Sequence, residues 1–336
     1  MTKKVKKNLR CVLLGHSMDK NIRGFWMNNS DRLKEIKQRL HVFNEAEEYA
    51  RLVEGNIPKA QHYISIIGIT LDFNSITIID ELITIRRVSN APGLVHLFGV
   101  ADLGHPDYFS IGRYSSNITA ELVAGFFELD NRDKLNCDFL LDIAWHILAL
   151  LKLRGHSTVF SPGYTSTSWD LVCIQPKNSL IFRSLDDLPR QLRIQPITVV
   201  TLEDMEWIKE YWNNALELRD RTSSGRFGLA YNVMYTWNHT DNYRVALANI
   251  WCGIESLFGR QSDRRVTDAL CQRISEWLPQ FSKSTIRDLY NQRCNAVHGR
   301  KLENNEIVKA IQESEEILRL SLIKCIETRE RTLPDW

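Results

Sequence analysis

Residues 243–258, YRVALANIWCGIESLF, carry apolar side chains on nearly every side of a predicted helix. Such a pattern is typical of a helix that its neighbours cover all round. The single carboxylate of the segment, Glu255, is therefore not expected to lie free in water. We predict that this helix forms the centre of a helical bundle.

The sequence on both sides of this segment continues the helical pattern. From residue 201 on, we expect a series of helices joined by short polar links, an all-α bundle. Thr201 and Asp204 have the spacing of a capping box at the start of the first helix. That helix carries the apolar stripe Met205, Ile208, Trp212 and Leu216, and the later helical segments are 227–237, 243–258, 266–278, 284–297 and 306–328.

Before residue 200 the pattern is mixed. Segments rich in β-branched residues predict strands at 63–71 and 75–88, as a hairpin or two adjacent strands, and at 93–100, 171–174, 179–182 and 197–200. Helices are predicted at 30–53, 118–129 and 138–153. The expected fold class is a mixed α/β N-terminal domain, residues 1–200, followed by an all-α C-terminal helical bundle, residues 201–336.

Composition narrows the class of protein. The chain has 336 residues, of which 43% are hydrophobic and 25% charged, which excludes a disordered chain, a coiled-coil rod and a collagen-like fibre. The net charge of +2 does not indicate a nucleic-acid binder, so any phosphate-binding surface must be local. The seven cysteines include no C-x-x-C pair, which indicates reduced thiols in a cytoplasmic protein. We expect no metal and no cofactor. We also expect no membrane-spanning segment, because the longest apolar stretch, 139–151, is too short to cross a bilayer.

The segment 289–299, LYNQRCNAVHG, holds the residues that suggest chemistry. Its apolar stripe, Ile286, Tyr290, Arg293 and Val297, places Arg293 where the pattern calls for an apolar residue, so this side chain needs a carboxylate, a partner subunit or a phosphate. His298 follows five residues later. Gly299 is expected to end the helix near Val297, and the turn can bring His298 towards the Arg293 side.

An arginine and a histidine at one helix end suit cleavage of a phosphodiester bond in RNA. Arg293 would hold the scissile phosphate, and His298 would act as general base or acid, since imidazole titrates near neutral pH. One histidine does not easily perform both proton transfers, so a symmetric dimer would supply a second copy. The structural alternative is that Arg293 pairs with Glu255 and His298 caps the helix through its charge.

At these residues the sequence resembles the HEPN superfamily of ribonuclease domains, in particular its Apea-like branch. The similarity covers residues 202–330 and rests on the segments 226–230 (RFGLA), 241–244 (DNYR), 253–258 (GIESLF) and 289–299. The resemblance implies a helical bundle that dimerises so that two R-x4-H motifs face each other and cut RNA without a metal. It also implies a 2′,3′-cyclic phosphate product and a role as a toxin or in antiviral defence, with a regulatory protein or phage-derived trigger as a further partner.

Carried over by position, the resemblance makes Arg293 and His298 the catalytic pair. Glu255 takes the acidic position of the central helix, where it would orient the arginine, and Tyr290 and Asn295 support the motif. The chain departs from the family pattern at Cys294, where many members have a polar residue, and at Arg300, where members silenced by tyrosine modification have Tyr.

Other candidates are weaker. Arg300 and Lys301 could grip the RNA backbone or form a solvated loop. Asp142 and His146, at positions i and i+4, are expected to form a hydrogen-bonded pair in the core. The Ser/Thr-rich segment 155–168 is interpreted as a surface loop.

Two hypotheses follow for the chain: a dimeric endoribonuclease restrained or directed by its N-terminal domain, or a non-catalytic HEPN bundle for dimerisation or RNA binding.

Overall fold

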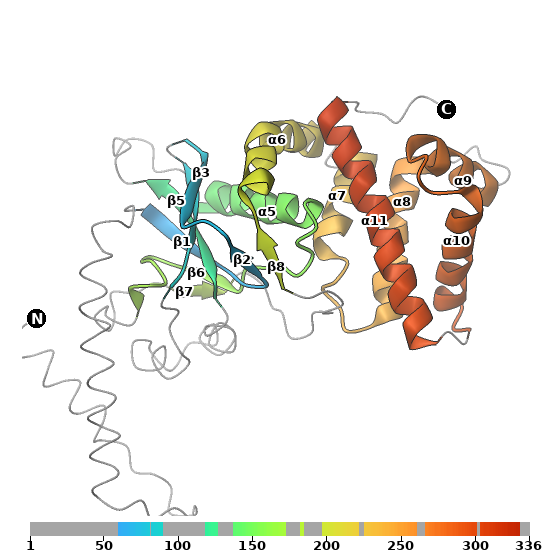
Figure 1. The fold of residues 1–336 in the computed structure, drawn as a ribbon, viewed down its shortest axis with the longest axis horizontal. Helices are drawn as coiled ribbons and strands as arrows, with labels where there is room; N and C mark the ends of the chain where they lie inside the picture. The colour runs from blue at the N-terminus through green and yellow to red at the C-terminus, as the bar shows by residue number, and fades with distance from the viewer. Residues whose placement is uncertain are drawn as a thin grey trace, which may run out of the picture.

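The computed structural model describes residues 60–80, 82–89, 118–126, 137–172, 182–184, 197–221, 225–260, 266–300 and 303–329. The predicted helix at 30–53 and strand at 93–100 lie outside these residues. Figure 1 shows a β-sheet at one end of the molecule and a group of helices at the other, with α5 (Cys137–Leu153) between them. The described part thus has the mixed α/β region and the helical C-terminal region that the sequence predicts.

The main sheet has six strands in the order β3-β4-β5-β1-β6-β7, and every neighbouring pair is antiparallel. A second sheet pairs β2 with β8 in parallel. The strand bounds are β1 Ala60–Ile66, β2 Ile69–Leu71, β3 Ser75–Ile79, β4 Ile83–Arg87, β5 Ala120–Phe126, β6 Gly163–Thr165, β7 Phe182–Ser184 and β8 Thr198–Val200.

Gly68 divides the first predicted strand, 63–71, into β1 and β2, which belong to different sheets. It has a φ of +84°, in the left-handed region. A Cβ atom there would overlap the carbonyl oxygen of Thr158, because the chain at Ile67 forms a bridge to Phe160. The predicted pairing of 63–71 with 75–88 is wrong: β3 and β4 form a hairpin with each other, and β5 lies between β4 and β1.

The prediction of a helix at 118–129 is also wrong, because residues 120–126 form β5. The segment is rich in Ala, Glu and Leu, which favour a helix. It instead pairs on both sides, with β1 and β4, and Leu122 and Val123 are both fully buried. Pairing with two neighbours therefore overrides the local helical preference.

The remaining strand predictions give a mixed result. The prediction at 197–200 is confirmed by β8. Leu171 and Val172 lie in a turn, not in a strand, because Leu171 N–H bonds back to Ser168 O. Of the segment predicted at 179–182, only Phe182 is among the described residues, and it begins β7.

The helix predicted at 138–153 is confirmed by α5, which joins the two regions. It contacts α6, α7 and α11 on one side and β5 on the other. Buried apolar residues of the sheet, of α5 and of the later helices form one continuous cluster. The change from strands to helices falls at the start of α6 (Leu202–Arg221), whereas separate domains at residues 1–200 and 201–336 stay a prediction.

After Val200 the described residues contain α6 and five further helices. Their bounds are α7 Arg226–Thr236, α8 Tyr243–Phe258, α9 Val266–Trp277, α10 Lys283–Val297 and α11 Asn304–Thr328. The capping box predicted for α6 is present, since Thr201 N–H donates to Asp204 and Asp204 N–H donates to the Thr201 hydroxyl. As predicted, α8 is central: it contacts α7, α9, α10 and α11. One face of it stays open at Val245 and Cys252.

Gly68→Ala should destabilise the protein by about 3 to 5 kcal/mol, since it combines an unfavourable positive φ with a clash against backbone. Gly155→Ala is the matched control: Gly155 also has a positive φ, of +94°, but nothing lies within 4 Å of its added Cβ. It should cost only about 1 to 2 kcal/mol. The measurement is the free energy of unfolding in urea, and equal losses in the two variants would contradict the close approach at Thr158.

Candidate functional site

The end of α10 carries the residues that the sequence singled out. Ser282 caps the start of the helix by accepting a hydrogen bond from Thr285 N–H. At the other end Gly299, with a φ of +69°, forms the left-handed turn. Arg300 N–H bonds to Asn295 O at 2.9 Å and Gly299 N–H to Ala296 O at 3.4 Å, the pair of bonds that defines a Schellman motif. The predicted helix end near Val297 is confirmed.

Arg293 lies beside Glu255 of α8. Its Nη2 atom is 3.3 Å from each carboxylate oxygen of Glu255, and its guanidinium stands 5.7 Å from the centre of the Tyr290 ring. Tyr290 in turn meets the edge of Trp251, also from α8, with the ring centres 5.4 Å apart. Glu255 and Tyr290 thus fix the position of Arg293 from two sides.

The contact with Glu255 leaves some polar atoms around Arg293 without hydrogen-bond partners. The Arg293 side chain is 21% exposed, and its Nε atom is buried without a hydrogen-bond acceptor. The neighbouring Gln292 has a buried Oε1 without a donor. Burial raises the pKa of Glu255, against the opposing effect of Arg293, and burial also raises the pKa of Tyr290, aided by Glu255 and Cys294. Arg293 therefore has hydrogen-bonding capacity that Glu255 alone does not use.

His298 is exposed at the end of α10. Its backbone N–H still donates to Cys294 O at 2.9 Å, so the chain follows the helix up to this residue and turns only at Gly299. The turn therefore does not bring His298 to the Arg293 side, contrary to the expectation. A step of five positions along a helix places the two about 140° apart around the helix axis. Among the described residues no hydrogen bond or ion pair joins these two side chains.

The sequence analysis did not find the role of Arg244, which stabilises the end of α10 from α8. Its Nη1 atom donates to the carbonyl oxygens of Ala296, at 3.1 Å, and Asn295, at 3.5 Å. Its Nη2 atom donates to Arg300 O at 2.8 Å. A cation at the C-terminus of a helix stabilises its free carbonyls. No spacing rule could find this residue, because it comes from another helix.

Two further predicted site residues belong to the same turn. Asn295 accepts a hydrogen bond from Arg300 Nη1 on its side-chain oxygen, at 3.3 Å. Arg300 itself is exposed. Lys301 lies outside the described residues. Cys294 is half-buried and, like Cys252, Cys271 and Cys325, forms no disulfide.

The predicted pair of Asp142 and His146 does not form. His146 is buried, and its ring nitrogens lie 2.8 Å from Trp212 O and 2.7 Å from the Tyr231 hydroxyl. Burial lowers its pKa to about 4. Asp142 is exposed and binds Arg219 of α6 at 2.6 Å. Both residues therefore connect α5 to α6, and His146 also connects it to α7 through Tyr231.

The prediction of a surface loop at 155–168 is wrong, because most of this segment is buried. It lies between the two sheets and includes β6. His156 is held by Thr198, at 2.8 Å, and by Asp204, at 3.3 Å. Burial by itself would raise the pKa of Asp204, but hydrogen bonds from His156, Thr201 and Arg154 lower it below its ordinary value. The Ser and Thr side chains of segment 155–168 find their hydrogen-bond partners within the protein. The polar composition of the segment alone does not reveal this.

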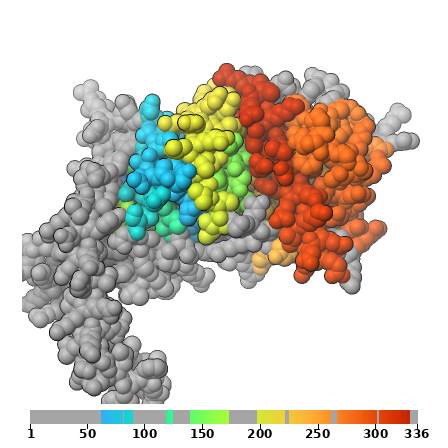
Figure 2. All heavy atoms as spheres, in the orientation of Figure 1, coloured from blue at the N-terminus to red at the C-terminus, as the bar shows by residue number. Residues whose placement is uncertain are grey.

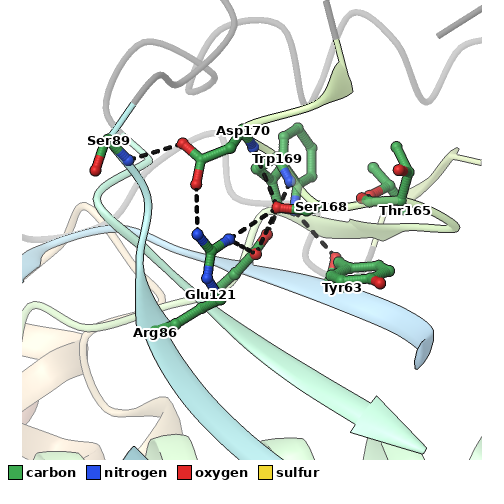
Figure 3. Close-up of polar contacts among 9 residues, drawn as sticks. Tyr63, Arg86, Ser89, Glu121, Thr165, Ser168, Trp169 and Asp170 are labelled. Atoms are coloured by element: carbon green, nitrogen blue, oxygen red, sulfur yellow. Dashed lines mark hydrogen bonds and ion pairs between the residues drawn. The ribbon is translucent and has the colours of Figure 1, made fainter. Parts of the chain in front are cut away.

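Figure 3 shows a second cluster, built around Arg86 of β4. Arg86 binds Glu121 of β5 at 2.5 Å and Asp170 at 2.8 Å, and it donates to Ser168 at 2.9 Å. Both carboxylates are fully buried, and burial raises the pKa of Glu121 against the opposing effect of Arg86. Trp169 N–H completes the shell of Glu121 at 2.8 Å. Because these charges satisfy one another, we interpret the cluster as structural.

The comparisons with known proteins find no relative. The chain matches no protein-family model, and neither a curated protein nor a solved structure is significantly similar to it. Within the described ranges, no helix has the length and apolar character needed to cross a membrane. The resemblance to HEPN domains therefore stays a prediction.

Arg244→Met should loosen the end of α10 without unfolding the bundle. The loss of three charge-assisted hydrogen bonds, partly exposed, should cost about 1 to 3 kcal/mol. The amides of His298, Gly299 and Arg300 should exchange with deuterium at least tenfold faster. The control is Arg287→Met, which lies on α10 itself and whose ion pair with Asp268 is half exposed on both sides. Unchanged exchange at 298–300 would contradict the role given to Arg244.

Arg86→Met should cost about 3 to 5 kcal/mol of unfolding free energy, because it leaves two buried carboxylates without their cation. Arg219→Met is the matched control. Arg219 also binds two carboxylates, Asp142 and Asp220, but these are 51% and 58% exposed. Its loss should cost about 1 kcal/mol or less. The measurement is the free energy of unfolding in urea. Similar losses for the two variants would show that burial of the Arg86 cluster does not increase its contribution to stability.

Proposed function

We propose that the protein is a metal-independent endoribonuclease that acts as a homodimer through its C-terminal helices. The observation that supports this most is the state of Arg293. It is oriented by Glu255 and Tyr290, partly exposed, and has donors to spare. A guanidinium held in this way can bind two oxygens of a phosphate group.

In the proposed reaction the 2′-hydroxyl of RNA attacks the adjacent phosphorus atom, and the bond from phosphorus to the 5′-oxygen breaks. One imidazole accepts the proton of the 2′-hydroxyl, and a protonated second imidazole gives a proton to the leaving 5′-oxygen. The products are a 2′,3′-cyclic phosphate and a 5′-hydroxyl. Arg293 offsets the negative charge that the phosphate gains in the transition state.

The positions of the two residues favour a site shared between two chains. Arg293 and His298 point about 140° apart around α10, so one chain does not present both to one phosphate. His298 is exposed, and its side chain forms no hydrogen bond or ion pair with the described residues. The open face of α8 at Val245 and Cys252, with the exposed Val297 of α10, gives a second copy an apolar surface to pack on.

A second candidate function follows from the same ion pair. Arg293 contacts Glu255 as a structural arginine would, and His298 stands at the C-cap of α10, where a cationic ring favours the helix dipole. In that case the chain is a non-catalytic HEPN-like bundle used for dimerisation or RNA binding. Loss of Arg293 would then reduce stability and leave no catalytic defect to measure.

The test compares purified wild type, Arg293→Ala and His298→Ala on total RNA in EDTA. Arg287→Ala is the control, since it removes an exposed arginine from the same helix. Wild type and the control should cut RNA to fragments with 2′,3′-cyclic ends, and each of the other two variants should be at least 100-fold slower. Sedimentation should give a dimer for all four proteins.

Three outcomes contradict the proposal. Equal degradation by all four proteins indicates a contaminating nuclease, and intact RNA with wild type indicates no such activity. A wild type that binds RNA without cutting it, while Arg293→Ala unfolds more easily, favours the non-catalytic bundle.

A further inference from the structure

A cavity of about 350 Å³ lies where the end of α5 meets the middle of α11. Its walls are Arg154 and Gly155, which directly follow α5, and a set of polar residues of α11, namely Gln312, Glu313, Glu315, Glu316 and Arg319. This is on α11, the long helix that crosses the front of the bundle in Figure 1 and appears in red on the surface in Figure 2. The volume is at the lower end of the range of small-molecule sites.

Glu315 distinguishes this cavity from an ordinary polar groove. Only 4% of the residue is exposed, and its Oε1 atom is buried without a hydrogen-bond partner. Burial raises the pKa of Glu315 to about 7, against the opposing effect of Arg319 and, more weakly, Lys152. A buried carboxylate oxygen that accepts no hydrogen bond is costly and calls for a donor.

The cations nearby already have other partners. Arg154 binds Asp204 at 2.9 Å and Glu203 at 3.6 Å and stacks over Trp207. Arg319 donates to Leu153 O at 3.2 Å and lies 3.6 Å from Glu316.

Lys152, which is fully buried, donates to Tyr235 O and to Asn238 Oδ1. Among the described residues, no hydrogen bond or ion pair joins Arg154 or Arg319 to Glu315, and Glu315 Oε1 accepts no hydrogen bond. Glu315 Oε1 therefore lacks a hydrogen-bond donor, and the three glutamates of the cavity wall outnumber its two arginines, which favours a donor with positive charge.

We propose that this cavity binds a small organic cation that donates N–H hydrogen bonds to Glu315, such as an alkylamine or an alkylguanidine. Glu313 and Glu316 add negative charge to the rim. The ligand would touch both the turn that follows α5, the helix that contacts β5, and α11, which packs on α6, α7, α8 and α10. The site is independent of the proposed nuclease site, which lies on α8 and α10.

The test uses the full chain and two probes, putrescine for the alkylamine and agmatine for the alkylguanidine. Each is titrated at pH 8 by isothermal calorimetry, and melting is followed with 10 mM of each at constant ionic strength. Wild type should bind at least one of them and melt about 2 to 4 °C higher. Tetramethylammonium, a cation without N–H groups, and the neutral 1,4-butanediol should have no effect.

The decisive variant is Glu315→Gln, which keeps the shape of the side chain and removes the charge. It should fold, because it removes a buried ionisable group, and it should bind the probe at least tenfold more weakly. The control is Glu206→Gln, an exposed glutamate of α6, which should bind as wild type does. Binding of neither probe by wild type, equal binding by Glu315→Gln, or equal effects of tetramethylammonium would each overturn the proposal.

Discussion

The burial of Trp251 at the centre of α8 is the contact on which the helical region depends. The ring is fully buried, its indole N–H donates to Ser314 of α11 at 3.0 Å, and its edge meets Tyr290 of α10. A buried indole must find an acceptor for its N–H group, so the position of Ser314 is fixed by this requirement. One side chain thus sets the spacing of three helices.

Both proposed sites are direct neighbours of this contact. Tyr290, on one side of Trp251, supports the guanidinium of Arg293. Ser314, on the other side, precedes Glu315, which lines the cavity. A change in packing at Trp251 would displace the Arg293 site and the Glu315 site together. This physical link is short, but coupling between the sites would need two distinct arrangements of these helices.

The sequence predicted the helical region better than the sheet because helical signals are local. The capping box at Thr201 and the turn at Gly299 both arise from residues a few positions apart, and both are confirmed. The partners of β5 lie far away in the chain, as does Arg86, which neutralises Glu121. No local pattern shows which distant strands pair with β5, so the composition of 118–129 predicts a helix. The prediction of a surface loop at 155–168 is wrong for the same reason, since the hydrogen-bond partners of this segment are also distant in the chain.

The candidate site shows the same division between local and distant information. The apolar stripe of α10 indicated that Arg293 needs a partner, and Glu255 of α8 is that partner. No local pattern indicates the roles of Arg244 and Glu315, because each role depends on residues distant in the chain: Arg244 bonds to the carbonyls at the end of α10, and Glu315 Oε1 accepts no hydrogen bond from the cations at the end of α5. A lone charged residue in a helical pattern is ambiguous until its surroundings are known. Arg293 has a partner and keeps donors free, Arg244 has its donors occupied, and Glu315 has an acceptor left empty. These three states fit three different roles: Arg244 stabilises a turn, and we propose that Arg293 binds a phosphate and that Glu315 attracts a cation.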